Sequence, residues 1–454
     1  MSWSARIRRR LADFARAKRG NVAITFAFAT LPVIGFVGAA VDFSHANSVK
    51  AALQAALDST ALMVAKDAPN VSSTELNSKA RAYFTALFTR PEATIVNISA
   101  TYSTAGGSNV LVTGKVTVPT TFMAVLGRDT MTVDGSSTTK WGSTRLRVAL
   151  ALDVTGSMAS AGKMTALKSA TKNLLNQLKA AAGQNGDVYV SIVPFNKNVN
   201  VGRSNYAANW IDWDDWEDAN GSWQTTTTCT STSRRGKSRC SSNQTWVPAS
   251  YSTWNGCITD RDRDYDQKVT APNPADATLP AGQASTLFPA EQYASCPAAM
   301  MGLSYNWTAM NSLVDALQPV GMTNQPIGLV WAWQSLVGGG PLTAPAKDAD
   351  YKYQEIIILM SDGMNTQNRW YSQQTPIDNR MYQTGNGSGT CANIKAAGIT
   401  IYSVQVNTDG DPTSTVMRNC ASSTDKFWMI TSANDLNGVF SAIGTNLTQL
   451  RVAK

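Results

Sequence analysis

Twenty consecutive residues near the N-terminus, Val22–Val41, carry no charge, and Asp42 ends the run. At 1.5 Å per residue, a helix of this length spans about 30 Å, the thickness of the hydrocarbon core of a bilayer. A cleaved signal peptide, with Gly38-Ala39-Ala40 as its cleavage site, is the alternative, but its apolar part usually runs for only about 7–15 residues. We therefore predict a retained transmembrane anchor over residues 20–42.

The apolar positions after the anchor follow first a helical and then a strand period. Val49, Leu53, Leu57 and Ala61 recur every four residues, which predicts a helix that either continues the membrane helix or packs separately on its own domain. Over residues 93–136 apolar and polar positions alternate, as they do in half-buried strands. A juxtamembrane helix and a small α+β region are therefore expected over residues 43–143.

A third rhythm begins near residue 144, where short apolar strands alternate with helical segments. Strands are predicted at 147–152, 187–194, 355–360, 399–406 and 427–430, and helices at 163–181, 307–317, 326–336, 391–397 and 433–450. This alternation favours an α/β fold, in which a mostly parallel sheet is covered by helices on both faces. We expect this domain to span residues 144–454.

The segment at about 197–305 interrupts the α/β rhythm and is too long for a simple loop. It is rich in tryptophan and cysteine, and we predict an insertion held by disulfides at one edge of the domain. Its acidic residues near Asp212 lie among tryptophans, which suits either a glycan- or protein-binding surface or a small core with solvated acids. Aspartate and arginine alternate over residues 260–266, and we expect them to pair with one another.

All six cysteines follow the anchor, and an even number on the exported side of a membrane predicts disulfides. Pairing of Cys391 with Cys420 is favoured because both flank one predicted helix–strand unit. The remaining four would pair among themselves, in an order that the sequence leaves open: Cys229, Cys240, Cys257 and Cys296.

The net charge of +8 comes mostly from the first 19 residues, which hold seven Lys or Arg against one acid. The rest of the chain is nearly balanced and shows no basic groove pattern, so nucleic-acid binding is not expected. A basic tail next to an apolar segment indicates membrane topology instead. It predicts a cytoplasmic N-terminus at residues 1–19 and places everything after Asp42 on the outer side of the membrane.

Oxygen-bearing side chains follow two of the predicted strands. Asp153, Thr155 and Ser157 come directly after one strand, Asp362 follows another, and Thr323 lies at the start of a predicted helix. Because ligands bind beyond the carboxyl ends of the strands in open α/β sheets, we expect these side chains to converge. Hydroxyls and carboxylates suit a hard divalent cation, above all Mg²⁺, with Ca²⁺ or Mn²⁺ as alternatives.

Catalytic motifs are missing from the sequence. His45 is the only histidine and lies beside the anchor, so a Ser-His-Asp arrangement is not available. The sequence has neither a phosphate-binding G-x-x-x-x-G-K-[ST] loop nor a C-x-x-C pair for zinc. We therefore do not expect an enzyme.

The pattern Asp153-x-Thr155-x-Ser157, with Thr323 and Asp362 further on, resembles the metal-ion-dependent adhesion site of von Willebrand factor A domains. The usual form has serine where Thr155 stands, and the substitution keeps the hydroxyl. The resemblance implies a cation whose charge is poorly neutralised and which keeps one position open. A protein partner would fill that position with an Asp or Glu carboxylate.

The N-terminal segment Arg19–Ala23 and the apolar run after it resemble the TadG-type proteins of bacterial tight-adherence (Flp) pilus systems. Further segments resemble that family's A-domain regions: Cys257–Asp262, Cys296–Met300, Gly321–Gln325, Ser361–Gln367 and Asn393–Tyr402. Prepilins have a glutamate five residues after their cleavage-site glycine, whereas Gly20 is followed at that distance by Thr25. Retention of the basic tail is therefore expected.

This resemblance implies a single-pass protein of the bacterial inner membrane whose main domains are periplasmic. It would assist pilus assembly or surface attachment through a divalent cation and a protein partner, either a pilus component or a surface ligand. The alternative is a structural envelope scaffold or minor pilus component whose A domain acts without metal.

Overall fold

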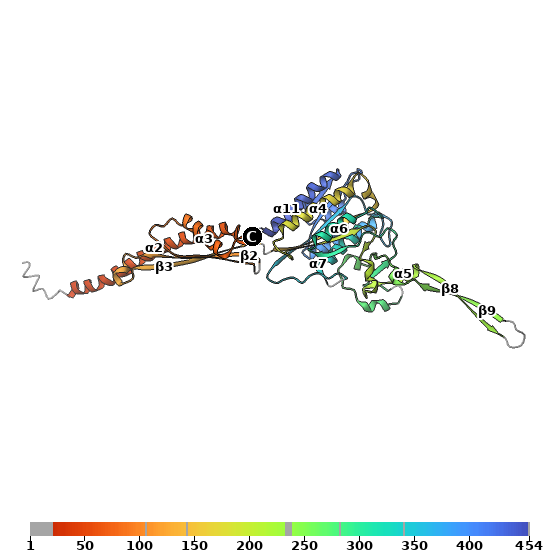
Figure 1. Cartoon of the computed structure of the whole chain (residues 1–454), viewed down its shortest axis with the longest axis horizontal. Coiled ribbons are helices and arrows are strands. Elements are labelled where there is room, and N and C mark those ends of the chain that lie inside the picture. Colours follow the sequence, from red (N-terminus) through yellow and green to blue (C-terminus); the bar gives the residue numbers. More distant parts are fainter. Residues whose placement is uncertain are drawn as a thin grey trace, which may run out of the picture. The chain divides into compact units, whose positions relative to one another are not determined.

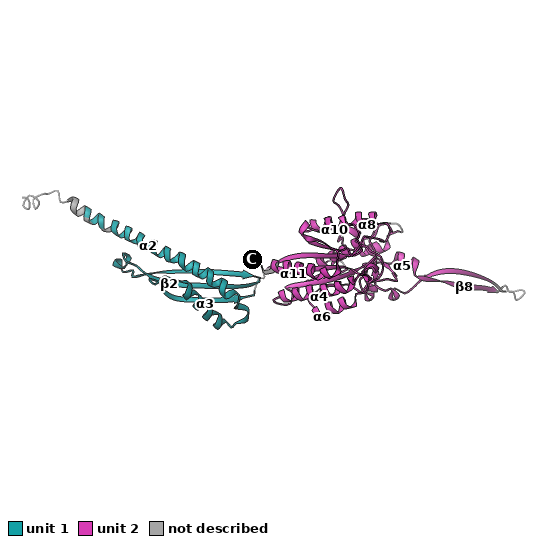
Figure 2. Cartoon of the chain, turned by 90° about the horizontal axis from the view of Figure 1, so that it is seen from above, with its two compact units in different colours: residues 1–141 teal, residues 142–454 magenta. Residues whose placement is uncertain are grey.

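The computed structural model describes residues 21–104, 107–141, 144–231, 238–280, 283–338 and 341–452. The chain forms two compact units, residues 1–141 and 142–454, which Figure 2 colours separately. The predicted cytoplasmic tail, residues 1–19, lies outside the described residues.

Helix α2 (Asn21–Ala65) dominates the first unit and is one continuous helix of 45 residues. The uncharged run and the four-residue repeat after it therefore belong to a single element. The stretch Phe28–Ala65 is, within the described residues, the one helix long and apolar enough to cross a membrane. The side chains of Phe26, Phe28 and Phe36 are largely exposed within the unit, as expected of a helix surface that lipid covers.

The C-terminal half of α2 packs on an antiparallel sheet of three strands, β1 (Thr94–Ser103), β2 (Ser108–Pro119) and β3 (Thr130–Trp141). Leu53 and Leu57 are fully buried there, as their spacing predicts. Gly114 and Gly135 face each other across β2 and β3 and make room for Leu57, because a Cβ atom at Gly114 would lie 2.9 Å from Leu57 Cδ2. Helix α3 (Ser73–Leu87) packs on α2 and β1, and the sequence pattern did not predict it. The unit also contains the 3₁₀ turns η1 (Ala68–Asn70) and η2 (Met123–Leu126).

The second unit is built on a large sheet whose central strands are parallel. Their order is β15–β14–β13–β4–β5, and β12 pairs antiparallel with β5. Taken in chain order, this is the 3-2-1-4-5-6 arrangement of doubly wound α/β folds, with an antiparallel strand at one end. The bounds are β4 (Thr144–Asp153), β5 (Val188–Phe195), β12 (Met301–Ser304), β13 (Lys352–Ser361), β14 (Thr400–Val406) and β15 (Phe427–Ile430).

Helices cover both faces of this sheet (Figure 1), and successive residues of the central strand β4 belong to the cores on opposite faces. Leu150 and Leu152 of β4 point into the core beneath α4, α6 and α11, whereas Ala149 and Ala151 belong to the core beneath α7, α9 and α10. The predicted α/β fold is therefore confirmed. The helices are α4 (Lys163–Ala181), α6 (Trp307–Ala316), α7 (Gln325–Val337), α8 (Gln374–Met381), α9 (Thr390–Ala396), α10 (Thr415–Cys420) and α11 (Leu436–Val452), with the turns η3 (Gly156–Ala159), η8 (Thr424–Lys426) and η9 (Ala433–Asp435).

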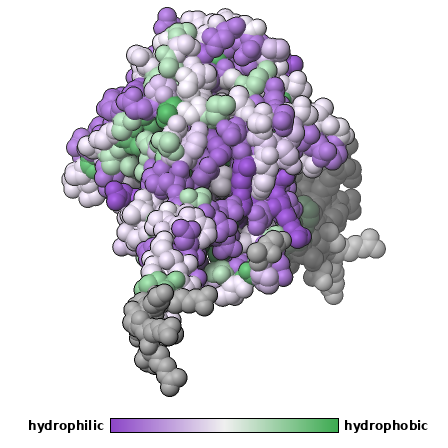
Figure 3. All heavy atoms as spheres, turned by 90° about the vertical axis from the view of Figure 1, so that its right-hand side faces the viewer, coloured by the Kyte–Doolittle hydropathy of each residue, from purple (hydrophilic) through white to green (hydrophobic). Residues whose placement is uncertain are grey.

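The predicted insertion extends the sheet beyond β5 through four short strands and carries a separate β8–β9 hairpin. Hydrophilic residues predominate on the molecular face seen from the side of this hairpin (Figure 3). The elements of the insertion are β6 (Val199–Asn200), η4 (Arg203–Ala207), β7 (Ile211–Asp212), α5 (Asp214–Ala219), β8 (Gly221–Ser231), β9 (Ser238–Pro248), η5 (Tyr251–Thr253), β10 (Cys257–Ile258), η6 (Tyr265–Gln267), η7 (Pro274–Thr278) and β11 (Phe288–Glu291).

Candidate metal centre

The carboxyl ends of β4 and β13 lie side by side, with Leu152 opposite Met360 in the parallel register. The chain leaves β4 toward α4 on one face of the sheet and leaves β13 toward α8 and α9 on the other. Connections that part in this way leave a crevice at the switch point of the strand order, where α/β folds bind ligands. Asp153 and Asp362 stand at this crevice.

The turn after β4 places two hydroxyls beside the carboxylates. The main-chain N–H of Thr155 donates to Asp153 Oδ1 at 2.8 Å, which fixes the turn on its own aspartate. Thr155 Oγ1 and Ser157 Oγ are 3.0 Å apart, and Ser157 Oγ donates to Asp362 Oδ1 at 2.7 Å. Four of the five predicted site residues are thus linked through a continuous set of hydrogen bonds.

Thr323 is brought to the same crevice by the loop before α7. The N–H of Gly156 donates to the carbonyl of Gly321 at 2.9 Å, which ties this loop to the turn after β4. Thr323 is buried, and its own N–H donates to Thr366 Oγ1 at 2.7 Å. The main chain of Thr323 is thus bonded to the segment after β13, and the hydrogen bond between Gly156 and Gly321 joins its loop to the Thr155–Ser157 turn.

The donor set fits a small hard cation. Octahedral Mg²⁺ with ligands at about 2.0–2.1 Å places neighbouring oxygens about 2.9 Å apart, close to the two oxygen–oxygen distances found here. Among the described residues no group of three or more His, Cys, Asp or Glu side chains is arranged to hold a metal. A cation at this crevice would therefore depend on hydroxyl oxygens as much as on its two carboxylates.

Burial dominates the electrostatics of Asp153. Loss of solvent and the nearby negative charge of Asp362 raise the pKa of Asp153 to about 7, against the opposing hydrogen bonds from Ser361 and Thr155. A neighbouring positive charge would stabilise the ionised carboxylate further, because it adds to the hydrogen bonds that offset the cost of removing this group from water.

Sequence reasoning missed Lys163, the first residue of α4. Its side chain is fully buried, and its ammonium lies 2.8 Å from Asp362 Oδ2 and 2.5 Å from Asp409 Oδ2. Burial alone would lower the pKa of Lys163, but the hydrogen bonds to both aspartates outweigh it and raise the pKa, so the group stays charged. The ammonium contacts Oδ2 of Asp362, whereas Ser157 donates to Oδ1 of the same carboxylate.

All six cysteines are paired in the structure. Cys391 bonds to Cys420, the pairing that the sequence favoured, and both residues are fully buried. The other two bonds join Cys229 to Cys240 and Cys257 to Cys296. The first links the two strands of the β8–β9 hairpin, and the second ties β10 to the segment before β12.

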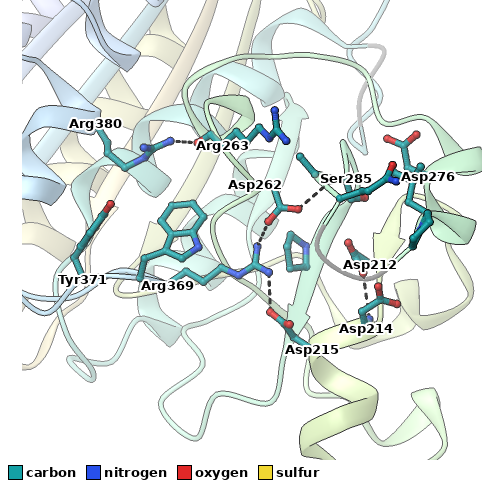
Figure 4. A pocket seen from close by; sticks show the side chains of 16 residues that line it. Asp212, Asp214, Asp215, Asp262, Arg263, Asp276, Ser285, Arg369, Tyr371 and Arg380 are labelled. Atoms are coloured by element: carbon teal, nitrogen blue, oxygen red, sulfur yellow. Dashed lines mark hydrogen bonds and ion pairs between the residues drawn. The ribbon is translucent and has the colours of Figure 1, made fainter.

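A separate polar pocket of about 520 Å³ lies between the insertion and the chain that follows β13. Figure 4 shows Arg369 reaching between Asp262, at 2.9 Å, and Asp215, at 2.7 Å, with Asp212 and Asp214 nearby. Burial and the neighbouring carboxylates raise the pKa of Asp214. The tryptophans next to these acids belong largely to a core: Trp213 stacks on Tyr251, and Trp216 and Trp254 are buried.

The pairing expected within residues 260–266 is wrong. Asp262 pairs with Arg369 and Asp266 with Arg380, both from the chain that follows β13. Arg261 donates to main-chain carbonyls, among them that of Thr270 at 2.7 Å. Residues that are neighbours in the sequence do not pair here, because the segment packs against the chain after β13. Arg369 and Arg380 of that chain bind the carboxylates of Asp262 and Asp266.

Residues 20–67 match the family model described as putative Flp pilus-assembly TadE/G-like. A search of curated proteins gave no match. The chain is similar to solved structures at low identity, and it spans only 46% and 35% of the length of the first two proteins so matched. These comparisons do not bear on the geometry of the site, and the assignment of the α/β fold rests on the strand order.

Three of these solved structures are of a pilus adhesin, a pilus tip protein and a mussel byssus protein. The pilus adhesin SpaC from Lactobacillus rhamnosus GG is 14% identical, with 80% of this chain and 35% of that chain covered and a TM-score of 0.35. The vWF domain of the type V pili tip protein Mfa5 from Porphyromonas gingivalis is 10% identical, with 68% and 97% covered and a TM-score of 0.34. Proximal thread matrix protein 1 from the mussel byssus, with a zinc-occupied MIDAS motif, is 12% identical, with 68% and 46% covered and a TM-score of 0.33.

The chain thus matches the TadE/G-like Flp pilus-assembly family over residues 20–67, and a doubly wound α/β domain follows this segment.

Proposed function

We propose that this protein is a membrane-anchored component of Tad/Flp pilus assembly or adhesion whose A domain binds a divalent cation, most simply Mg²⁺, and through it a carboxylate of a protein partner. The ligands are Asp153, Thr155, Ser157, Thr323 and Asp362. The partner is a pilus-assembly component or a surface ligand. The domain binds without catalysing a reaction.

One observation carries the proposal. Two carboxylates from adjacent strand ends and two hydroxyls from one turn meet at the switch point, with oxygen–oxygen distances of 3.0 and 2.7 Å. A bound cation would supply a strong positive charge at a place where an incoming carboxylate can reach it. The protein's own residues fix the positions of the oxygens before any partner arrives, because each is held by hydrogen bonds to its neighbours.

Thermal melting of the A domain tests the cation. Mg²⁺ added after removal of metals is expected to raise the melting temperature of the wild-type domain, because a ligand that binds only the folded state stabilises it. Asp153→Ala should lose the increase, whereas Asp315→Ala, which removes an exposed surface carboxylate on α6, should keep it. If neither Mg²⁺, Mn²⁺ nor Ca²⁺ stabilises the wild type, the cation is ruled out.

The proposed location is the bacterial inner membrane, with the N-terminus in the cytoplasm and both units in the periplasm. It is supported by the apolar helix and by the seven basic residues in the first 19 positions of the chain. The exposed Cys229–Cys240 bond offers a test. After reduction, a membrane-impermeant thiol reagent should label Cys229 in intact spheroplasts, and labelling only after lysis would reverse the orientation.

A second candidate function is a structural scaffold whose A domain acts without metal. The buried ammonium of Lys163 favours it, because this group already supplies a positive charge to Asp362 at 2.8 Å. The two functions differ in partner capture. Under the adhesion proposal, a chelator or Asp153→Ala should release the partner that co-purifies with the anchored protein, whereas a scaffold would retain it.

A further inference from the structure

The tip of the β2–β3 hairpin presents apolar side chains to solvent. The tip comprises residues 121–128 and includes the turn η2, and Gly127 closes it with a φ of +79°. Phe122 is 42% exposed, Val125 85% and Leu126 71%. Large aliphatic side chains are seldom this exposed side by side without a partner that covers them.

The carboxylate of Asp42 fixes this tip on helix α2. It accepts three main-chain hydrogen bonds, from the N–H groups of Thr121 at 2.9 Å, Phe122 at 2.9 Å and Met123 at 2.7 Å. Asp42 is also the residue that ends the uncharged run of the helix. The tip is therefore held at the level where the chain passes from apolar to polar surroundings.

Phe122 reaches further along the helix, onto the apolar run itself. A Cβ atom at Gly38 would lie 2.5 Å from Phe122 Cβ, so the close approach requires glycine at this position. Gly38 precedes Asp42 by four residues, which is about one helical turn or roughly 6 Å. The tip thus overlaps the last turn of the apolar run.

The sheet extends from this level in the opposite direction. Gln54 of α2 donates to the carbonyl of Ser136 at 3.0 Å, so β3 runs along the later, polar part of the helix. Figure 1 shows α2 continuing past the hairpin tip toward the N-terminus. The tip therefore lies at the level of exposed apolar residues of the helix, among them Val37 and Val41.

We propose that the tip of the β2–β3 hairpin is a second membrane contact, which inserts Val125 and Leu126 into the lipid surface beside the transmembrane part of α2. The inference rests on the proposed membrane anchor. Lipid is the occupant because the exposed side chains continue the apolar surface of the helix at its end. Arg128, which directly follows the tip, is exposed and suits the phosphate groups at such a surface.

The contact gives the first unit a defined position on the membrane. A single helix can rotate and tilt in a bilayer, and its orientation is set by neighbouring groups that anchor at the interface. A second contact held on the helix by three hydrogen bonds restricts both motions. The sheet would then rise from the membrane at a fixed angle.

Site-specific fluorescence in vesicles tests the proposal with the full-length chain. All six native cysteines are in disulfides, so a new cysteine can be labelled selectively with an environment-sensitive dye. Val125→Cys reports on the tip. Phe36→Cys, in the apolar run, reports on the anchor, and Lys140→Cys, ten residues along β3 from Thr130 and roughly 33 Å away, is the matched control.

The vesicles contain phosphatidylethanolamine and phosphatidylglycerol with a nitroxide-labelled lipid as quencher. We expect the dye at position 125 to be quenched several-fold more strongly than the dye at position 140. Quenching at position 36 without quenching at 125 would overturn the hairpin contact and leave the anchor intact. Loss of quenching at both positions would overturn the anchor itself. A dye at 125 that is protected in native membranes but not in pure lipid would assign the tip to a neighbouring protein and refute the lipid contact.

Discussion

Replacing Lys163 by methionine tests the charge balance of the candidate metal centre most directly. Methionine keeps much of the length and apolar volume of the lysine side chain but removes the ammonium that lies 2.8 Å from Asp362 and 2.5 Å from Asp409. Asp409 is half exposed and can be solvated again, whereas Asp362 is buried and cannot. The variant therefore leaves a buried carboxylate without a compensating charge.

Breaking a buried ion pair by removing one partner costs about 3–5 kcal/mol. For a domain of this size, each kcal/mol lowers the melting temperature by roughly 2 °C, so the variant should melt about 6–10 °C below the wild type when chelator is present. Added Mg²⁺ should narrow this difference, because the cation supplies the missing positive charge to the same carboxylate.

Lys172→Met is the matched control, since Lys172 lies on the same helix α4 but forms an exposed ion pair with Asp315. Exposed pairs contribute about 0–1 kcal/mol, so this variant should melt within roughly 2 °C of the wild type, with or without Mg²⁺. Differential scanning calorimetry of the α/β domain with chelator and with Mg²⁺ gives all these melting temperatures. If Lys163→Met melts like Lys172→Met in chelator, the ammonium does not hold the aspartate. If Mg²⁺ leaves a large difference unchanged, the cation does not bind there.

Three further predictions follow from burial and covalent linkage. Burial and the nearby carboxylate of Asp362 raise the pKa of Asp153 in the folded state to about 7, above the ordinary value of 3.8. In the metal-free protein, the contribution of Asp153 to stability is therefore full below about pH 4 and is lost as the pH rises through 7. A cation binds the ionised form of Asp153, so Mg²⁺ should raise the melting temperature more at pH 8 than at pH 5. Equal increases at the two pH values would contradict this prediction. Serine in place of both Cys391 and Cys420 removes a disulfide that spans 29 residues and should lower the free energy of unfolding of the α/β domain in urea by about 3–4 kcal/mol. An unchanged midpoint would show that the disulfide does not restrict the unfolded chain. Leu57→Ala removes a fully buried side chain and should cost about 2–5 kcal/mol, measured by circular dichroism of the first unit, whereas Leu62→Ala, exposed on the same helix, should change stability by less than about 0.5 kcal/mol.

The elements of the α/β domain could be predicted because their apolar periods are strong. The helix expected at 163–181 and the strand expected at 427–430 appear with those bounds. Helix α3 escaped prediction because its buried positions are only Leu76, Ala80 and Phe84, three residues in a polar stretch. The short strand β12 escaped for a related reason, since four residues at a sheet edge carry too little pattern to stand out.

The residues of the site also differ in whether an apolar pattern in the sequence reveals them. Asp153 and Asp362 could be found because each directly follows an apolar strand, and in a parallel sheet the carboxyl ends of the strands share one edge. Lys163 could not be found in this way. It is the first residue of a helix, a position where lysine is usually solvated, and only the fold shows that its side chain turns inward to Asp362. Its partner Asp409 follows β14, in a loop with no pattern of its own.

The charges around the crevice argue for a carboxylate as the group that completes the proposed site. Asp153 and Asp362 bring two negative charges and Lys163 brings one positive charge, all of them buried. The carboxylate of Asp409, which also pairs with Lys163, is half exposed, so water screens its charge and it counts for less in this balance. With a divalent cation bound, this buried group would hold one positive charge in excess, which a low-dielectric site tolerates poorly. An Asp or Glu from a partner removes the excess, whereas an uncharged hydroxyl or amide does not. Without the cation, the same group is one charge negative when Asp153 is ionised and neutral when it is protonated, since the pKa of Asp153 is about 7, and in neither state does it attract a carboxylate. Under the adhesion proposal, the buried lysine therefore sharpens the dependence on the cation, because with Lys163 in place one divalent ion makes the net charge of the site positive.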